Sequence, residues 1–101
     1  MEYSSNFLKD IENSLIELNI MIESAIKQRM LNFDMFYTLR DGLNELKLKV
    51  ENRHELDSVF FKKWDRVMGW VHITFEGTPL LDLVRSIDKV IVSLESDNIK
   101  K

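Results

Sequence analysis

The stretch LKDIENSLIELNIMIESA, residues 8–25, decides the fold because its apolar residues recur with the period of a helix. The spacings alternate between three and four residues, at Leu8, Ile11, Leu15, Leu18, Ile22 and Ala25. Such a pattern puts a continuous apolar stripe on one helix face. Ser4 or Ser5 can cap the helix by accepting a hydrogen bond from a backbone N–H. We therefore expect a first helix over about 5–30.

Three further apolar residues of this segment, Ile16, Ile20 and Met21, lie off the stripe. They widen the apolar face, so the first helix is expected to touch more than one neighbour. Glycine and proline together contribute only four residues, which favours long helices over many short strands. Because no repeat, linker or low-complexity stretch divides the sequence, residues 1–101 are expected to form a single helical domain.

Apolar stripes of the same kind predict the second and fourth helices. The second is expected over about 34–51, and its stripe consists of Met35, Leu39, Leu43, Leu46 and Val50. Gly42 lies inside it, where glycine costs up to about 1 kcal/mol relative to alanine, and is expected to mark a close helix approach. The fourth helix is expected over about 79–95, followed by a polar frayed tail over 96–101. Its stripe consists of Leu80, Val84, Ile87, Ile91 and Leu94.

The segment EGTPLL, residues 76–81, marks the boundary between the last two helices. Gly77 can adopt the left-handed conformation that ends a helix. Thr78 can cap the next helix, and Pro79 suits its first position because proline needs no hydrogen-bond acceptor there. This is the sharpest local signal in the chain.

The third helix is expected over about 54–76, with Asn52 and Glu55 at the spacing of a capping box. Its segment WVHITF, residues 70–75, also alternates in the way that a strand would. A helical wheel that starts at Leu56 gathers ten large apolar residues into one continuous arc of about 200°. The wheel uses far more of the sequence than the alternation does, so we interpret the segment as helical.

This arc holds five of the ten aromatic residues and is wider than a surface helix requires. One interpretation is that the third helix is the most buried of the four, because aromatic side chains dominate small cores. The other is that Phe61 and Trp70, at the edges of the arc, stay exposed as a partner or self-association surface. In both cases four helices with short connections predict an all-α, antiparallel four-helix bundle.

The chain contains no cysteine, which removes disulfides, thiolate metal sites and cysteine nucleophiles together. No apolar run approaches the ~20 residues that a membrane span needs, and the acidic start lacks the basic residues of a secretory signal. We expect a cytoplasmic protein that does not enter a membrane.

No catalytic set, cofactor or metal site is expected. Glu51 and His54 have the Glu-x-x-His spacing of di-iron bundles, but the second such pair that those sites require does not occur. The three glycines lie far apart in the sequence, so they form no phosphate-binding loop. We therefore expect that the protein is not an enzyme.

One pattern leaves an enzymatic alternative open. Arg66 and His72, separated by five residues in RVMGWVHITFEG, resemble the arginine–histidine signature of HEPN helical ribonucleases. The resemblance implies RNA cleavage by these two side chains. Val67, however, stands where that family often has a polar residue, and the wheel separates Arg66 from His72 by about 120°.

The net charge is −3, and the acidic residues concentrate toward the two ends of the chain. A net acidic protein without a basic block is not expected to bind nucleic acid, but it suits a basic protein partner. The leading hypothesis is a small acidic protein-binding module, an immunity protein, antitoxin or inhibitor, that docks through its first and last helices. The expected contact residues are Asp10, Glu17, Asp82 and Asp88. A helical adapter or a structural homodimer, built on the aromatic face of the third helix, is the alternative.

Overall fold

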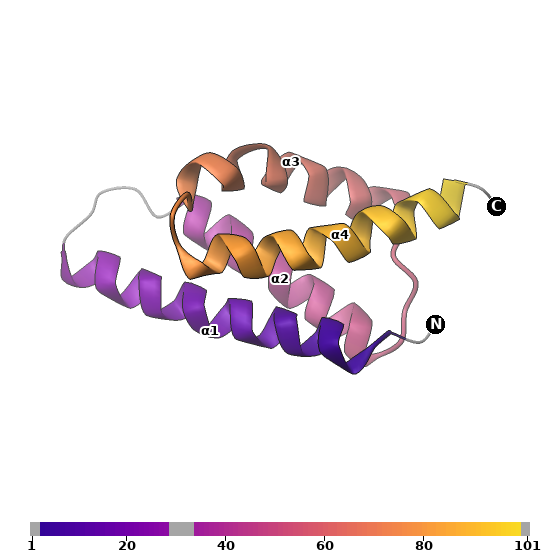
Figure 1. Cartoon of the computed structure of the whole chain (residues 1–101), viewed down its shortest axis with the longest axis horizontal. Coiled ribbons are helices and arrows are strands. Elements are labelled where there is room, and N and C mark those ends of the chain that lie inside the picture. Colours follow the sequence, from indigo (N-terminus) through magenta and orange to yellow (C-terminus); the bar gives the residue numbers. More distant parts are fainter. Residues whose placement is uncertain (1–2, 29–33, 100–101) are drawn as a thin grey trace.

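The computed structural model describes residues 3–28 and 34–99. These residues form four helices: α1 (Ser5–Lys27), α2 (Asp34–Glu51), α3 (Ser58–Thr74) and α4 (Pro79–Ile99). Successive helices run in opposite directions (Figure 1). The chain therefore has the predicted all-α, antiparallel four-helix bundle, and the part of it that the structure describes contains no strand.

The four helices form a ring in which each helix touches two neighbours. Helix α1 packs against α2 and α4, and α3 packs against the same two helices. The diagonal pairs, α1 with α3 and α2 with α4, stay farther apart. The bundle measures 47 × 24 × 20 Å, so its long axis follows the helices. Each helix consequently keeps an outer face that no other described helix covers.

One continuous cluster of buried side chains fills the centre of the ring and draws on all four helices. Most of it comes from the apolar stripes predicted from the sequence. Trp64 is the largest fully buried side chain, and its ring stacks on Phe60 with centroids 6.1 Å apart and planes 19° apart. The interpretation of the aromatic arc of α3 mainly as core is therefore correct.

Helix α1 begins at its predicted cap. The Ser4 hydroxyl accepts a hydrogen bond from the backbone N–H of Phe7 (3.2 Å) and so satisfies one of the unpaired donors of the first turn. The helix ends at Lys27. Residues 29–30 of the predicted helix lie outside the described residues. For α2 the predicted and observed bounds, 34–51, agree.

The predicted start of α3 is wrong. The helix begins at Ser58, because Asp57 rather than Asn52 acts as the cap and accepts from the backbone N–H of Phe60 (2.9 Å). The Asn52 side chain instead donates to the carbonyl of Leu48, inside α2 (2.8 Å). Asparagine at this position therefore belongs to the end of one helix and not to the start of the next.

Arg53 ends α2 by adopting a left-handed backbone conformation, with φ of 57°. The next N–H, that of His54, then returns to the carbonyl of Lys49 (2.8 Å), as in a Schellman motif. Glycine is the usual residue at such a position, so the sequence does not indicate this helix end.

The junction between α3 and α4 is built as predicted around Gly77, whose φ is 78°. Helix α3 ends slightly early, at Thr74, and the chain turns over the next residues. The Thr78 hydroxyl donates to the carbonyl of Phe75 (2.7 Å) and fastens this turn. The prediction that Thr78 caps α4 through its side chain is therefore wrong, because the hydroxyl bonds back to the end of α3. Phe75 itself is fully buried, so the turn is anchored in the core.

Helix α4 begins at Pro79, as predicted, but it is longer than predicted. The expected frayed tail over 96–101 is wrong as far as Ile99, which is the last helical residue. Neither glycine nor proline occurs after Pro79, so no residue type in this segment forces the helix to stop. Residues 100–101 lie outside the described residues.

Candidate functional site

Helix α1 exposes three large isoleucines, of which Ile26, near the end of the helix, is 53% exposed. Ile16 is 57% exposed and Ile20 is 54% exposed, one helical turn apart. The prediction that α1 touches more than one neighbour is confirmed, because α1 packs against both α2 and α4. Its core stripe makes these contacts and Met21 packs against the core, but Ile16 and Ile20 stay more than half exposed. These two side chains form an apolar strip that faces solvent.

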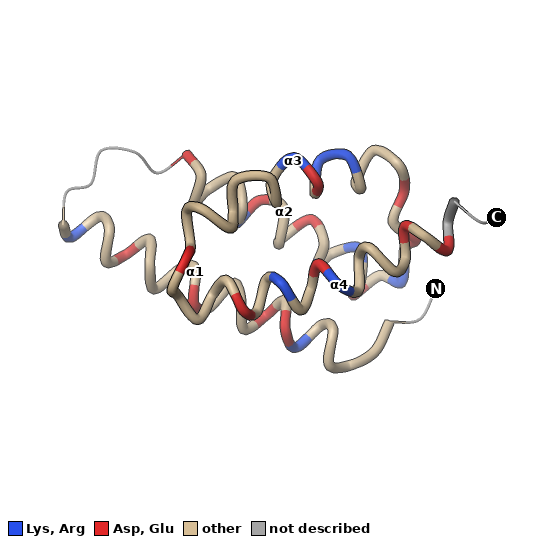
Figure 2. Tube along the Cα trace, turned by 45° about the horizontal axis from the view of Figure 1, so that its top comes forward, with Lys and Arg blue, Asp and Glu red and all other residues tan. Residues whose placement is uncertain are grey.

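Acidic side chains surround this strip. Between Lys9 and Lys27, α1 contains four acidic residues and no basic residue. Figure 2 shows the acidic positions along α1. We call the set Glu12, Ile16, Glu17, Ile20 and Glu23 the α1 surface. It combines apolar area with negative charge, which is the composition expected of a surface that docks onto a basic protein.

A shallow groove of about 410 Å³ borders the α1 surface on the side of α2. Glu12 and Ile16 line it from α1, and Arg40 and Lys47 line it from α2. The Arg40 guanidinium lies 4.6 Å from the ring centroid of Tyr37, in a cation–π contact that orients it along α2. The negative character of the α1 surface therefore ends at α2.

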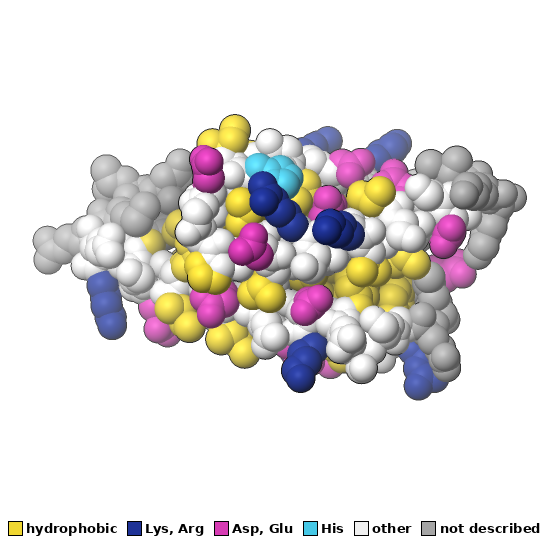
Figure 3. Space-filling view, viewed as in Figure 1, with side chains coloured by type: hydrophobic (Ala, Val, Ile, Leu, Met, Phe, Trp, Pro, Cys, Tyr) yellow, Lys and Arg dark blue, Asp and Glu magenta, His cyan; other side chains and the backbone are white. Residues whose placement is uncertain are grey.

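The opposite flank of α1 faces α4, and it carries Asp10 and Glu17. Both are half-buried and, being seven residues apart, lie on the same side of the helix. Figure 3 shows apolar side chains along the seam between α1 and α4, with acidic side chains among them. From α4, Val90 is 36% exposed on this side. Two of the four predicted acidic contacts thus adjoin the exposed strip of α1.

The other two predicted contacts, Asp82 and Asp88, lie elsewhere on α4. Asp82 is exposed in the first turn, where a carboxylate is favoured by the helix dipole. Asp88 is half-buried and accepts a hydrogen bond from the indole Nε1 of Trp64 (2.8 Å). It therefore faces α3 and has an internal structural role, so the four acids do not form one surface. The sequence contains one indication of this contact, since a tryptophan expected in the core needs a hydrogen-bond acceptor for its indole N–H.

The prediction of an exposed Phe61 is wrong. Its side chain is 4% exposed and makes an edge-on contact with Phe60, at 6.3 Å and 72°. Trp70 is half-buried and packs against the core. The exposed apolar residues of α3 are instead Val59, at 60%, and Ile73, at 80%. The helical wheel places Val59 in the apolar arc. It therefore identifies the apolar side of α3, but it does not show which residues of that side the neighbouring helices cover.

The structure does not bring Arg66 and His72 together. Arg66 is exposed and lines a groove that α3 forms with α2. His72 is exposed on the side of α4, where its Nδ1 accepts from Nε of Arg85 (3.4 Å). The two side chains that the ribonuclease resemblance would pair therefore point to different neighbouring helices.

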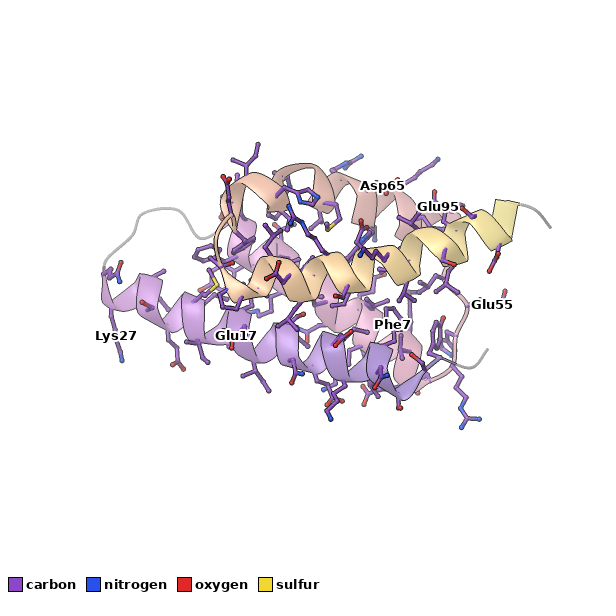
Figure 4. The ribbon with its side chains drawn as sticks, viewed as in Figure 1. Phe7, Glu17, Lys27, Glu55, Asp65 and Glu95 are labelled. Atoms are coloured by element: carbon purple, nitrogen blue, oxygen red, sulfur yellow. The ribbon has the colours of Figure 1, made fainter. Side chains whose placement is uncertain are left out.

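The end of the bundle that holds the start of α1 contains a tyrosine with a shifted pKa. The Tyr3 hydroxyl donates to the backbone carbonyl of His54, and its ring packs against Phe7 with centroids 5.8 Å apart. Burial raises the pKa of Tyr3 above the usual value of 10.0, and the carboxylate of Glu55 raises it further. Figure 4 shows Phe7 directed from α1 into the bundle and Glu55 on the loop between α2 and α3. This contact ties the start of α1 to that loop.

Within the described residues, no group of three His, Asp or Glu side chains is placed to hold a metal ion. None of the described helices is long and apolar enough to cross a membrane. No family model, no curated protein and no solved structure matches this chain.

Proposed function

We propose that this chain is a small protein-binding module that docks through the α1 surface onto a basic protein, in the manner of an immunity protein, antitoxin or other inhibitor. The observation that carries the proposal is the exposure of Ile16 and Ile20, both more than half exposed, within a helix segment whose charged residues are all acidic. Covering each isoleucine would contribute about 1 kcal/mol or more, since full burial of such a side chain contributes about 1.5–3 kcal/mol.

The surrounding carboxylates give the surface its specificity. Glu12 and Glu23 lie on one side of the isoleucine strip, and Glu17 lies on the other. Charges at the rim of an interface accelerate encounter with an oppositely charged partner and fix its orientation, more than they add affinity. A basic partner would thus be steered by the glutamates and held by the isoleucines.

The experiment uses the immobilised protein to capture partners from an extract of its own cells, with mass spectrometry to identify what binds. We expect a basic protein that is released as the salt concentration rises, because salt screens exposed charges. Ile20→Asp should weaken its binding by about tenfold or more, because the change removes the apolar contact and buries a carboxylate among the apolar groups that cover Ile20, whereas the glutamates meet the partner's basic groups at the rim. Glu17→Lys should slow association.

Ile73→Asp is the matched control, because Ile73 is also an exposed isoleucine but belongs to α3. All three variants should keep the helical circular dichroism of the parent protein, since the substituted side chains are exposed or half-buried. A partner that binds the Ile20→Asp variant as tightly as the parent contradicts the proposal, as does the failure of any basic protein to bind at low salt.

A homodimer formed through α3 is the second candidate, and the exposed Val59 and Ile73 favour it. Helix geometry places both on the same side of α3 as the half-buried Trp70. Sedimentation equilibrium would then give twice the monomer mass, and Ile73→Asp would return the monomer. Ile20→Asp should leave this dimer intact, so the two candidates predict opposite outcomes for the same pair of variants.

A further inference from the structure

A second groove lies between α2 and α3, away from the α1 surface. Its volume is about 310 Å³, at the small end of the range for sites that bind small molecules. Phe60, Trp64 and Val67 line it from α3, and because all three are buried they form its floor. Helix α1 takes no part in this groove, so its function is independent of the function proposed above.

Gly42 keeps the groove open. The sequence predicts a close helix approach at this glycine, and that prediction is wrong, since a Cβ placed there would meet no atom within 4 Å. The residue lies in the interior of α2, where glycine lowers helix stability and packing does not require it. Any larger side chain at this position would project into the groove that Gly42 lines.

Opposite charges occupy the two sides of the groove. Asp41 and Glu45 line it from α2, and Lys63 and Arg66 line it from α3. Across the described parts of the chain, none of these four side chains forms an ion pair within 4.0 Å. The groove thus holds a row of carboxylates apart from a row of cations, above an apolar floor.

We propose that this groove binds a small zwitterion with an apolar side chain, namely an α-amino acid of the aromatic type. Its ammonium group would meet Asp41 and Glu45, its carboxylate would meet Lys63 and Arg66, and its ring would lie on the floor formed by α3. A zwitterion complements both sides at once. A nucleotide would match Lys63 and Arg66 but leave Asp41 and Glu45 without a positive partner, and an internal peptide segment has no free ammonium and carboxylate on the same carbon atom.

The experiment titrates L-phenylalanine into the isotopically labelled protein and follows backbone amide signals by NMR. We expect saturable shifts, in the millimolar range, at residues that line the groove. Phenethylamine and 3-phenylpropionate, which each lack one of the two charges, should bind several-fold more weakly, because each loses its contacts with one row of charges. Equal binding of either analogue, or no saturable shift with L-phenylalanine, overturns the proposal.

Gly42→Leu fills the groove and should abolish the shifts. Gly69→Leu is the matched control, because Gly69 is also a helical glycine at which an added Cβ would meet no atom within 4 Å, but it does not line the groove. Lys63→Ala and Arg66→Ala, both at exposed positions, give a second test that does not depend on the fold of the leucine variant, and each should weaken binding a few-fold. Retention of full affinity in Gly42→Leu, or in both alanine variants, refutes the assigned site.

Discussion

The three glycines of the chain should respond to alanine with different signs. Gly42 and Gly69 lie in helix interiors with no atom within 4 Å of an added Cβ, whereas Gly77 has a φ of 78°. In a helix interior the added methyl group lowers the backbone entropy of the unfolded chain, and no clash offsets the gain. At a left-handed position the same methyl group approaches the following carbonyl oxygen.

The magnitudes follow from these environments. Gly42→Ala and Gly69→Ala should each raise the free energy of unfolding by about 0.5–1 kcal/mol. In a domain of this size that corresponds to a rise in Tm of about 2–8 °C. Gly77→Ala should lower the free energy of unfolding by about 1–2 kcal/mol, because its backbone must keep a left-handed conformation that alanine disfavours.

Urea unfolding followed by circular dichroism measures the three differences, and unchanged m-values would show that the compactness of the two states is unaltered. A lower stability for Gly42→Ala would mean that the space beside Gly42 is occupied. It would remove the structural basis of the groove between α2 and α3. A neutral Gly77→Ala would contradict the role assigned to the left-handed turn.

Three further predictions concern single contacts. Asp88→Ala should destabilise the protein by about 1–3 kcal/mol, because the indole N–H of Trp64 loses its acceptor. Asp88→Asn retains an acceptor oxygen and should therefore cost less. Chemical denaturation measures the free energy of unfolding of both variants. Tyr3→Phe should cost about 0.5–1.5 kcal/mol near neutral pH, through loss of the bond to the His54 carbonyl. Because the pKa of Tyr3 is raised in the folded state, its contribution is complete below pH 10.0 and is lost as the pH rises through the folded pKa, so the parent and variant stabilities should converge in alkali. Leu56 lies in a loop but is buried, so Leu56→Ala should lower the free energy of unfolding by about 2–5 kcal/mol, as for a core residue. Thermal or urea unfolding measures this cost. A cost under about 0.5 kcal/mol would show that Leu56 does not anchor the loop in the core.

The bundle could be predicted because its signals are local and repeated. The stripe of α1 recurs over the length of the helix, and the sequence Gly77-Thr78-Pro79 combines a residue suited to a left-handed turn with one suited to a helix start. The start of α3 could not be predicted in the same way. Asn52 and Asp57 are both acceptable caps, and the choice depends on Arg53 adopting a conformation for which its residue type has little preference.

The candidate surface was predicted less well than the fold, because a helical wheel gives angles and not neighbours. On α1 it counts Ile16 and Ile20 as part of a wide buried face, and on α3 it counts Val59 in the same way, although all three are exposed. The ring arrangement decides this outcome, since each helix has two neighbours and can bury only the sector between them. The sequence predicts that Asp88 contacts a partner protein, but in the structure its carboxylate accepts a hydrogen bond from Trp64, 24 residues away in the sequence.

The two proposed sites share a physical signature that the wheel does not detect. Ile16 and Ile20 occupy solvent-exposed helix positions, where leucine, glutamate or lysine would favour the helix by a few tenths of a kcal/mol. Gly42 occupies a helix interior where alanine would fit and would stabilise the chain. In each case the residue lowers helix stability and the packing of the chain does not require it. Functional sites are where such locally unfavourable residues are expected, because selection for stability alone would replace them. Gly69 and Ile73 have the same property, so the two sites are assigned by the acidic residues around Ile16 and Ile20 and by the charged residues that line the groove beside Gly42. The α1 surface and the groove between α2 and α3 should therefore be the regions in which stabilising substitutions weaken binding.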